Sequence, residues 1–378
     1  MVEYAVRRTT ARGRAGTLRK WGSVEVNHAT PCFLVYTRAG HIPHLTWEVA
    51  STQLSLSQQP PIYQLTLPSL IEMQPQLEAC GGGVHRFCGL PAGAPTHLAI
   101  EDPLQERKSG YNDSVSVAIW NHTGKRSLTP SLLAKAASAC GSSSVDALLD
   151  YDTPEGTTSL KRRHKAVERT AGWHAQMEAL LAPSIGLVSA VGGGDSGQHR
   201  RKLAEFHASA PTVSIDVRGF DDSEKWRDLL HESVKPLSPA SLRLAHGAFS
   251  PSEVVSLVAG GVDVVDSSWT VMMAEKGCGF RIPDAFPSTT SDVEVVDYND
   301  QGGKATFTPP FADCSCYTCS NYTTAYLCHL HNTKELLAPI LLVIHNLSQW
   351  DKMFIQIRRQ IDGGEEVQEE APVEGGDN

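Results

Sequence analysis

The stretch SLRLAHGAFSPSEVVSLVAGGVDVVDSSW, residues Ser241 to Trp269, decides the fold class. It begins with a short apolar strand pattern, continues as a helix pattern that starts at Ser250 and Pro251, and ends in a second apolar strand pattern. Two strands joined by one helix form a βαβ unit, whose strands run parallel in one sheet. The stretch therefore predicts an α/β protein with a parallel sheet.

The same alternation extends toward the N-terminus. Strand patterns occur at Ser114 to Trp120, Val145 to Asp152, Ile185 to Val191 and in TVSIDVRG, and helix patterns separate them, beginning with Thr129 to Gly141. Five or more such units without a dinucleotide-binding glycine motif favour a closed (β/α)₈ TIM barrel over an open sheet. We expect PCFLVYT and the Pro-rich region before Tyr111 to supply the first barrel strands and an N-terminal β-element.

In such a barrel, functional side chains gather where the strands end. The predicted strand ends place Asp152, Gly192 to Gly194, Arg218 and Asp266 at the mouth. Carboxylates at strand ends more often accept hydrogen bonds from loop backbone than act in catalysis. Both interpretations of Asp152 and Asp266 are therefore kept.

Charge is unevenly distributed along the 378 residues. The tail from Ile361 to Asn378 holds seven acids and no bases, and removing its −7 from the total of −9 leaves −2 for the rest of the chain. This Gly- and Glu-rich tail is expected to be disordered. Bases cluster at 7–20, 161–165 and 199–202. Together these clusters permit contact with RNA, although each alone is typical of a solvated surface.

No apolar run reaches the roughly 18 residues needed to span a bilayer. The N-terminus lacks the apolar core of a secretory signal, so the expected compartment is the cytoplasm. Cysteines in a protein of that compartment are more often metal ligands or buried thiols than disulfides.

Four of the nine cysteines fall within the fifteen residues from Cys314 to Cys328. Cys314, Cys316 and Cys319 form C-x-C-x₂-C, which brings three thiolates to one turn. Zn²⁺ prefers four tetrahedral ligands, so a fourth donor is required. Candidates are Cys328, His329, His331 and His345. We predict His345, on the helical stripe with Leu337, Ile344 and Leu347, and keep Cys328 as the second choice.

A site with four protein ligands leaves no open position for water, unlike a catalytic zinc site. The predicted Zn²⁺ is therefore single and structural, and it would hold a small lobe together. We expect three regions: a barrel with its N-terminal β-element over 1–280, a polar insertion with the zinc lobe and C-terminal helices over 281–361, and the acidic tail over 362–378.

A barrel followed by C-x-C-x₂-C and a distant histidine resembles the tRNA-guanine transglycosylase family. RGRAGTLRKWGSVEVNHATPCFLV, residues Arg12 to Val35, is similar to the opening of that family, and Arg243 to Ser267 is similar to its nucleophile segment. The resemblance extends to about Ile361 and is most specific at the zinc end.

The family's reaction needs a carboxylate that attacks C1′ of the ribose and a second carboxylate that acts as general acid and base. The resemblance places the nucleophile position at Asp266 and loosely matches Asp152 to a residue that reads the purine. Near Cys80 to Pro91, where the second carboxylate is expected, the sequence has no acid. Met272 and Glu275 stand where active members carry phosphate-binding arginines.

The purine-binding segments also differ from those of active members. AVGGG, residues Ala190 to Gly194, lacks a glutamine, and DVRGFDDSE, residues Asp216 to Glu224, has Val217 and Arg218 around a single glycine. These departures imply a non-catalytic subunit with no catalytic residue of its own, in which Asp266 and Asp152 are vestigial candidates.

The resemblance implies a heterodimer with the catalytic subunit of a queuine tRNA-ribosyltransferase. That pair would exchange guanine for queuine at wobble position 34 of tRNAs with GUN anticodons. It further implies contact with tRNA, pairing of subunits through the zinc lobes, and peripheral attachment to the mitochondrial outer membrane. Two alternatives stay open: an active transglycosylase that uses Asp266, and a zinc-dependent RNA-binding scaffold.

Overall fold

Eight parallel strands close into a barrel in the computed structural model, which describes residues 2–106, 108, 110–153, 158–287, 293–299 and 306–365. Around the barrel the order is β10-β11-β12-β13-β4-β5-β6-β9. The closure pairs the last strand with the first, Val264 of β13 beside Cys32 of β4. The strands are β4 (Cys32–Tyr36), β5 (Tyr63–Thr66), β6 (Thr96–Ala99), β9 (Ser144–Asp146), β10 (Gly186–Val191), β11 (Thr212–Ile215), β12 (Leu242–Leu244) and β13 (Val264–Asp266). The predicted (β/α)₈ TIM barrel is confirmed.

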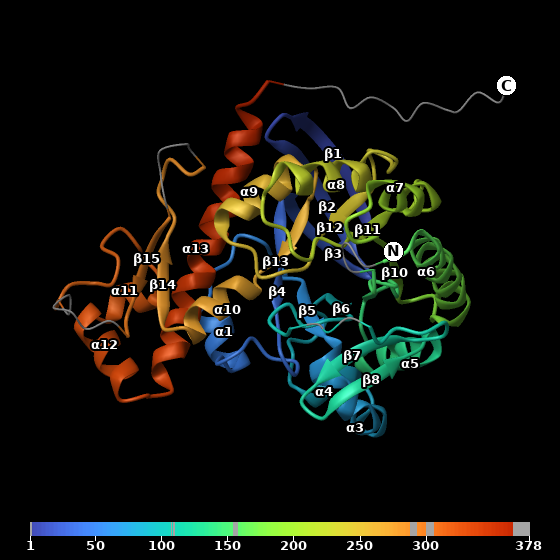
Figure 1. Ribbon diagram of the computed structural model, residues 1–378. Coiled ribbons are helices and arrows are strands. Elements are labelled where there is room, and N and C mark those ends of the chain that lie inside the picture. The colour runs from blue at the N-terminus through green and yellow to red at the C-terminus, as the bar shows by residue number, and fades with distance from the viewer. Residues whose placement is uncertain are drawn as a thin grey trace.

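Helices lie between successive strands and surround the barrel in Figure 1. Local sequence sets their ends. The helix after β12 begins with a capping box in which Ser250 and Glu253 bond each other's backbone, and the helix before β9 ends at Gly141, whose φ of 64° suits glycine. The helices are α1 (Trp47–Gln53), α2 (Leu67–Leu70), the 3₁₀ turn Ile71–Met73, α3 (Gln74–Cys80), α4 (Gly83–Phe87), α5 (Pro130–Cys140), α6 (Leu160–Leu180), α7 (Gly197–Phe206), α8 (Glu224–Val234), α9 (Pro251–Ala259) and α10 (Ser268–Glu275).

The expected N-terminal β-element is an antiparallel sheet of β1 (Glu3–Thr10), β2 (Gly13–Trp21) and β3 (Val24–Thr30). It covers the end of the barrel where the strands begin. Trp21 Nε1 donates to the carbonyl of Thr96, and the buried Arg14 reaches the carbonyl of Ser241 and the carboxylate of Asp263. Because this sheet closes one end, the opposite end is the one available for a functional site.

Two expectations about strands were wrong. The segment Ser114 to Trp120 does not join the barrel, because β7 (Val117–Asn121) pairs with β8 (Gly124–Leu128) in a separate antiparallel hairpin between β6 and α5. The strand expected to end at Asp152 ends at Asp146, since the next residues leave the barrel as a loop. A one-sided apolar pattern does not distinguish a barrel strand from a hairpin that packs on its outside.

The remaining part of the chain forms a lobe beside the barrel, on the left of Figure 1. Its elements are β14 (Cys278–Arg281), β15 (Glu294–Asp297), α11 (Tyr317–Asn321), α12 (Thr324–Asn332) and α13 (Leu337–Asp362). The predicted polar insertion contains β15, which pairs with β14. Helix α13 joins the two parts, as Asn346 Nδ2 donates to the carbonyls of Thr270 and Cys278. The tail expected to be disordered lies, from 366 onward, outside the described residues.

Candidate metal centre and barrel mouth

Three cysteines meet at the turn that leads into α11. Cys316 is the residue before the helix, and its Sγ accepts a hydrogen bond from the backbone N–H of Cys319 at 3.5 Å. This cap holds the second and third sulfurs of the motif on the same side of the turn. The spacing C-x-C-x₂-C thus lets Cys316 cap the helix and brings the sulfurs together without a bound metal.

His345 brings a nitrogen to these sulfurs from α13. Its Nδ1 lies 3.6 Å from Cys314 Sγ, 3.5 Å from Cys316 Sγ and 3.3 Å from Cys319 Sγ. Ligands of tetrahedral zinc at the usual bond lengths have sulfur and nitrogen about 3.5 Å apart. The structure therefore brings together the four residues that the sequence predicted, at the spacing that a zinc ion requires.

The surroundings of the four donors also fit a metal. His345 Nε2 lies 2.8 Å from the carbonyl oxygen of Phe280, so the proton on Nε2 is donated there and the lone pair of Nδ1 faces the sulfurs. Phe311 stacks on the imidazole at 4.6 Å, and Gln349 Nε2 donates to Cys314 Sγ at 3.3 Å. Hydrogen bonds among the three thiols lower the pKa of Cys314 and raise that of Cys319, so the sulfurs share their protons in the absence of a metal.

The second choice for the fourth ligand does not join this cluster. The metal-binding group of the lobe consists of Cys314, Cys316, Cys319 and His345, whose ligand atoms lie within 4.8 Å of one another. The other candidates, Cys328, His329 and His331, belong to α12 and are not part of this group. Cys328 packs instead in the hydrophobic core. Its sulfur serves packing, as buried free cysteines commonly do.

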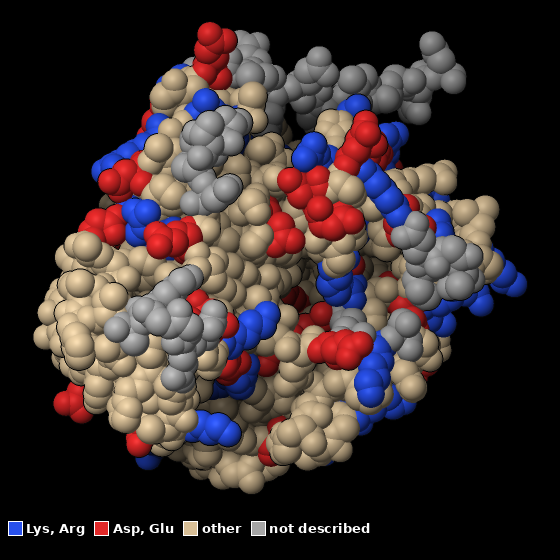
Figure 2. Space-filling model, turned by 60° about the vertical axis from the view of Figure 1, so that its left-hand side comes forward, with Lys and Arg blue, Asp and Glu red and all other residues tan. Residues whose placement is uncertain are grey.

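A cavity of about 730 Å³ opens at the ends of the barrel strands. Gly194 and Arg218, which the sequence placed at the mouth, line it, and the guanidinium of Arg218 pairs with Asp216 and lies over the ring of Tyr151 at 4.5 Å. Figure 2 shows a hollow with charged side chains of both signs. The cavity is polar enough to bind a ligand, but its cations are already paired with protein groups.

Asp266 ends β13 as predicted, yet it is fully buried. Its carboxylate accepts hydrogen bonds from the backbone N–H groups of Gly247 and Ser268, both at 2.8 Å. His246 Nδ1 lies 3.8 Å away, and His246 rather than Asp266 is among the described residues that line the cavity. Burial raises the pKa of Asp266. The predicted nucleophile position thus holds a carboxylate that lies behind the cavity wall.

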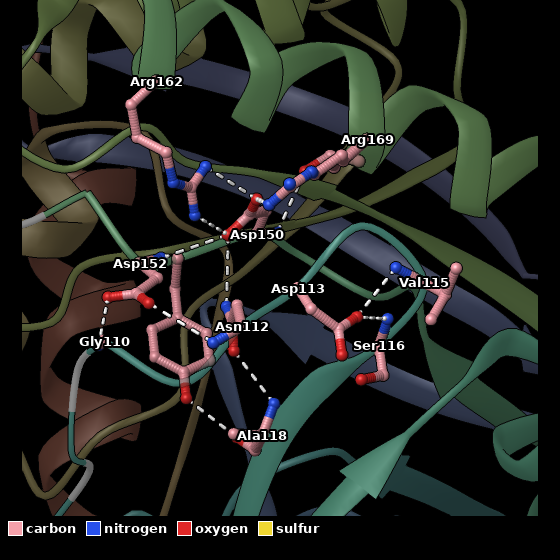
Figure 3. A network of polar contacts seen from close by, with 12 residues as sticks. Gly110, Asn112, Asp113, Val115, Ser116, Ala118, Asp150, Asp152, Arg162 and Arg169 are labelled. Atoms are coloured by element: carbon pink, nitrogen blue, oxygen red, sulfur yellow. Dashed lines mark hydrogen bonds and ion pairs between the residues drawn. The ribbon is translucent and has the colours of Figure 1, made fainter. Parts of the chain in front are cut away.

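Asp152 lies in the loop six residues beyond the end of β9 and not at a strand end, which corrects the expectation. Its carboxylate accepts hydrogen bonds from the backbone N–H groups of Gly110, at 2.6 Å, and of Asn112, at 3.3 Å. Beside it, the buried Asp150 binds Arg162 and Arg169 of α6, as Figure 3 shows. Both carboxylates tie the loop before the hairpin to the barrel. The loop-bonding interpretation of Asp152 therefore accounts for its contacts.

The segment that was examined for a second acid does not line the mouth cavity. Cys80 to Pro91 lies in α3, α4 and the loop before β6, whereas the loop that follows β6 at the mouth carries Glu101 and Asp102, which line the cavity. The Asp102 carboxylate accepts hydrogen bonds from the hydroxyl of Tyr36 at 2.7 Å and from the backbone N–H of Leu104 at 3.0 Å. Sequence analysis did not single out Glu101 and Asp102, which closely follow the end of β6.

Glu275 does not point a free negative charge at the solvent. Its carboxylate binds Arg38 at 2.9 Å and lies 3.4 Å from His44 Nε2. Glu275 and Arg38 thus form an internal ion pair.

The basic clusters are also largely paired inside the molecule. Arg7 binds Asp362, Arg163 binds Asp195, Arg201 binds Glu232, and Arg200 is buried, with its guanidinium on the carbonyls of Gly194 and Asp216. These pairings weaken the expectation that the clusters form a continuous RNA-binding surface.

The sequence did not single out His97, Asp146 and His246, which meet at the mouth. Two lie in β6 and β9 and the third follows β12, as many as 149 positions apart, and no local motif joins them. Had the strand been predicted to end at Asp146, that residue would have been recognised as a carboxylate at the barrel mouth.

Comparison with known proteins agrees with this architecture. The family model described as "Queuine tRNA-ribosyltransferase" matches residues 9–370. The protein named "Queuine tRNA-ribosyltransferase accessory subunit 2" is 45% identical in Caenorhabditis elegans and 46% in Caenorhabditis briggsae, each over 97% of this chain and 100% of the relative. The protein of that name in Xenopus tropicalis is 29% identical over 89% of this chain and 90% of the relative.

Within the described residues, no helix combines the length and apolar character that crossing a membrane requires. The barrel, the cluster of three cysteines and one histidine, and the match over nearly the whole chain lead to the same conclusion as the motifs. The chain belongs to the queuine tRNA-ribosyltransferase family, the tRNA-guanine transglycosylases that its sequence resembles.

Proposed function

We propose that this protein is the non-catalytic accessory subunit of a heterodimeric queuine tRNA-ribosyltransferase. Its partner, the catalytic homologue, exchanges guanine for queuine at wobble position 34 of tRNAs with GUN anticodons. The observation that carries the proposal is the state of Asp266, which is fully buried and bonded to two backbone N–H groups. A nucleophile must reach the ribose, and this carboxylate does not line the cavity.

Two further observations support a non-catalytic role. Glu275, which the resemblance matches to a phosphate-binding arginine of active members, forms an ion pair with Arg38. Asp102 and Glu101 leave an acid at the mouth, but Asp102 is engaged by Tyr36 and Leu104. The relatives named as accessory subunits match this chain over nearly its whole length, which supports the same role.

The metal in this proposal is one structural Zn²⁺ bound by Cys314, Cys316, Cys319 and His345. Four protein ligands leave no open position for water or substrate, so the ion stabilises the lobe and takes no part in the reaction. Soft thiolate ligands with one imidazole favour Zn²⁺ over the harder Mg²⁺ and Ca²⁺.

The zinc lobe also supplies a surface for the partner. Phe307 is 90% exposed, Leu336 80% and Tyr326 40%, and we call these three residues the lobe patch. Phe307 lies beside the start of α12, where residues 306 and 308 bond the helix backbone, Tyr326 lies within α12, and Leu336 follows its end by four residues. Exposed apolar side chains of this size are typical of protein interfaces. The tRNA would then contact the pair mainly through the catalytic subunit, in the cytoplasm.

The proposal is tested by labelled-guanine exchange into tRNA. We expect no exchange by this chain alone and exchange by its mixture with the catalytic homologue. Exchange by the purified chain that disappears in Asp266→Asn would instead establish an active transglycosylase. Binding of tRNA by the chain alone, without any complex with the homologue, would favour an RNA-binding scaffold.

A further inference from the structure

Three side chains from three barrel strands meet on the floor of the mouth cavity. His97 lies within β6, Asp146 ends β9, and His246 follows β12 by two residues. One ligand atom of each lies within 4.8 Å of the other two. Asp146 and His246 line the cavity, and His97 lies behind them, fully buried. This cluster is distinct from the cysteine cluster of the lobe.

The spacing of these atoms is that of metal ligands. His97 Nε2 lies 3.3 Å from Asp146 Oδ1, and His246 Nε2 lies 3.3 Å from Asp146 Oδ2. Hydrogen bonds to a carboxylate are shorter, typically about 2.8 Å. Nitrogen and oxygen ligands of one tetrahedral ion, each about 2.1 Å from it, lie about 3.4 Å apart. The same comparison holds at the cysteine cluster, where the sulfur–nitrogen distances are 3.3 to 3.6 Å.

The converging atoms also have unmet bonding capacity. Asp146 Oδ1, His97 Nε2 and His246 Nε2 are buried and, apart from the ion-pair contacts inside the cluster, make no hydrogen bond of acceptable geometry with the described residues. Buried polar atoms are seldom left in that state unless water or an ion completes them. The Asp146 carboxylate lies between the two imidazoles, with one oxygen toward each, so a ligand shared by the three residues would bind beside it.

A neighbouring hydroxyl orients His97 toward the cluster, whereas His246 must turn before it can bind. Ser144 Oγ lies 2.9 Å from His97 Nδ1, which leaves Nε2 directed at the cluster. Asp266 Oδ2 lies 3.8 Å from His246 Nδ1, too far for a hydrogen bond but near enough to become the carboxylate that commonly backs a metal-bound histidine once His246 turns. The two rings are nearly parallel, 8° apart, so joint binding requires His246, on the cavity wall, to turn about its Cβ–Cγ bond.

We propose that His97, Asp146 and His246 form a second metal site, for a divalent first-row transition ion. Two imidazoles and one carboxylate are the ligands of such ions, whereas Mg²⁺ and Ca²⁺ prefer oxygen ligands alone. The remaining coordination positions face the cavity, where an oxygen or nitrogen ligand of a small molecule can bind. The site does not depend on the proposed accessory role, since it rests on residues of this chain alone.

The test uses Co²⁺ as the probe on the full-length chain with its lobe already loaded with Zn²⁺. Equilibrium dialysis should find one Co²⁺ per chain, and the absorption spectrum should lack the thiolate-to-cobalt band that binding at the cysteines would produce. His246→Gln and Asp146→Asn should each weaken Co²⁺ binding at least about a hundredfold, and Asp266→Asn about tenfold.

The matched control is His207→Gln, a buried histidine at the end of α7 that lies outside the cluster. It should bind Co²⁺ as the wild-type protein does. The zinc content and melting temperature of each variant establish that it is folded, and His246 tolerates substitution best because it lines the cavity. The proposal is overturned if no stoichiometric Co²⁺ binds, if the thiolate band appears, or if binding survives both His246→Gln and Asp146→Asn.

Discussion

The Nε2 atom of His345 lies 2.8 Å from the carbonyl oxygen of Phe280. This hydrogen bond joins α13 to β14 and directs Nδ1 at the three sulfurs, so the metal ligand and the contact between two elements of the lobe depend on one imidazole. A metal bound there would therefore stabilise the lobe as a whole.

His345→Ala is expected to remove the zinc and to lower the free energy of unfolding by at least about 4 kcal/mol, the range seen when a metal site is lost. Zinc content by mass spectrometry and urea unfolding measure both effects. A chelator should shift the unfolding curve of the wild-type protein and leave that of the variant unchanged. Cys328→Ser, in the same lobe but outside the ligand set, should retain the metal. A variant that keeps stoichiometric zinc would refute the assignment.

Leu336→Glu and Phe307→Glu are expected to abolish the complex with the catalytic homologue, because each places a charge in the lobe patch, whose apolar side chains would be buried in the interface. Size-exclusion chromatography of the mixture measures the complex. Zinc content and melting temperature should not change, since both side chains are exposed. Leu160→Glu, at a position 61% exposed on α6, is the control and should leave the complex intact. Pairing that survives both lobe variants would place the interface elsewhere.

Asp266→Asn is expected to leave the exchange rate of the mixed pair within about twofold of wild type, since the carboxylate is buried and does not line the cavity. The variant should lose about 1 to 2 kcal/mol of stability, because the amide places a donor against the N–H of Gly247 or Ser268. The equivalent substitution at the nucleophile of the catalytic homologue should abolish exchange. A large loss of rate from the Asp266 variant would show that this pocket reacts.

His28 is expected to make the protein less stable as the pH falls. Burial lowers the pKa of His28 to about 4 from the ordinary value of 6.5, although its bond to the carbonyl of Pro60 acts in the opposite direction. Between these values the unfolded chain binds the proton and the folded chain does not. Stability is therefore complete above pH 6.5 and falls by about 3 kcal/mol toward pH 4.

His28→Gln keeps a donor for Pro60 and removes the titration, so the slope of unfolding free energy against pH should flatten by that amount. Urea unfolding between pH 7 and pH 4 measures it, with the exposed His122→Gln as the control. An unchanged slope in His28→Gln would contradict the burial argument.

Much of the fold could be predicted because the barrel repeats one local pattern. Helices α5 and α9 begin at Thr129 and Ser250, whose side chains cap them, and these signals are short-range. The hairpin of β7 and β8 was mistaken for a barrel strand, because its apolar face packs against the barrel as a strand would. Which of two partners an apolar face meets is decided by tertiary packing, which sequence periodicity does not contain.

The site shows the same division. The cysteine cluster was predictable because three ligands lie within six residues and the fourth is on an amphipathic helix. The residues at the barrel mouth were not predictable in this way. The sequence pattern placed the end of β9 at Asp152, so Asp152 was taken for the carboxylate at the strand end in place of Asp146. Asp102 and His246 are single residues in loops after β6 and β12, and only the closed barrel places them near Asp146.

The central claim, that this chain assists a catalytic partner without reacting itself, is tested most directly by titration. A fixed amount of the catalytic homologue is mixed with increasing amounts of this protein, and the initial rate of labelled-guanine incorporation into tRNA is measured. The account predicts a rate that rises and levels off at one chain per catalytic subunit, with no incorporation by this chain alone. A rate that does not respond to the added chain, or incorporation in the absence of the homologue, would contradict it.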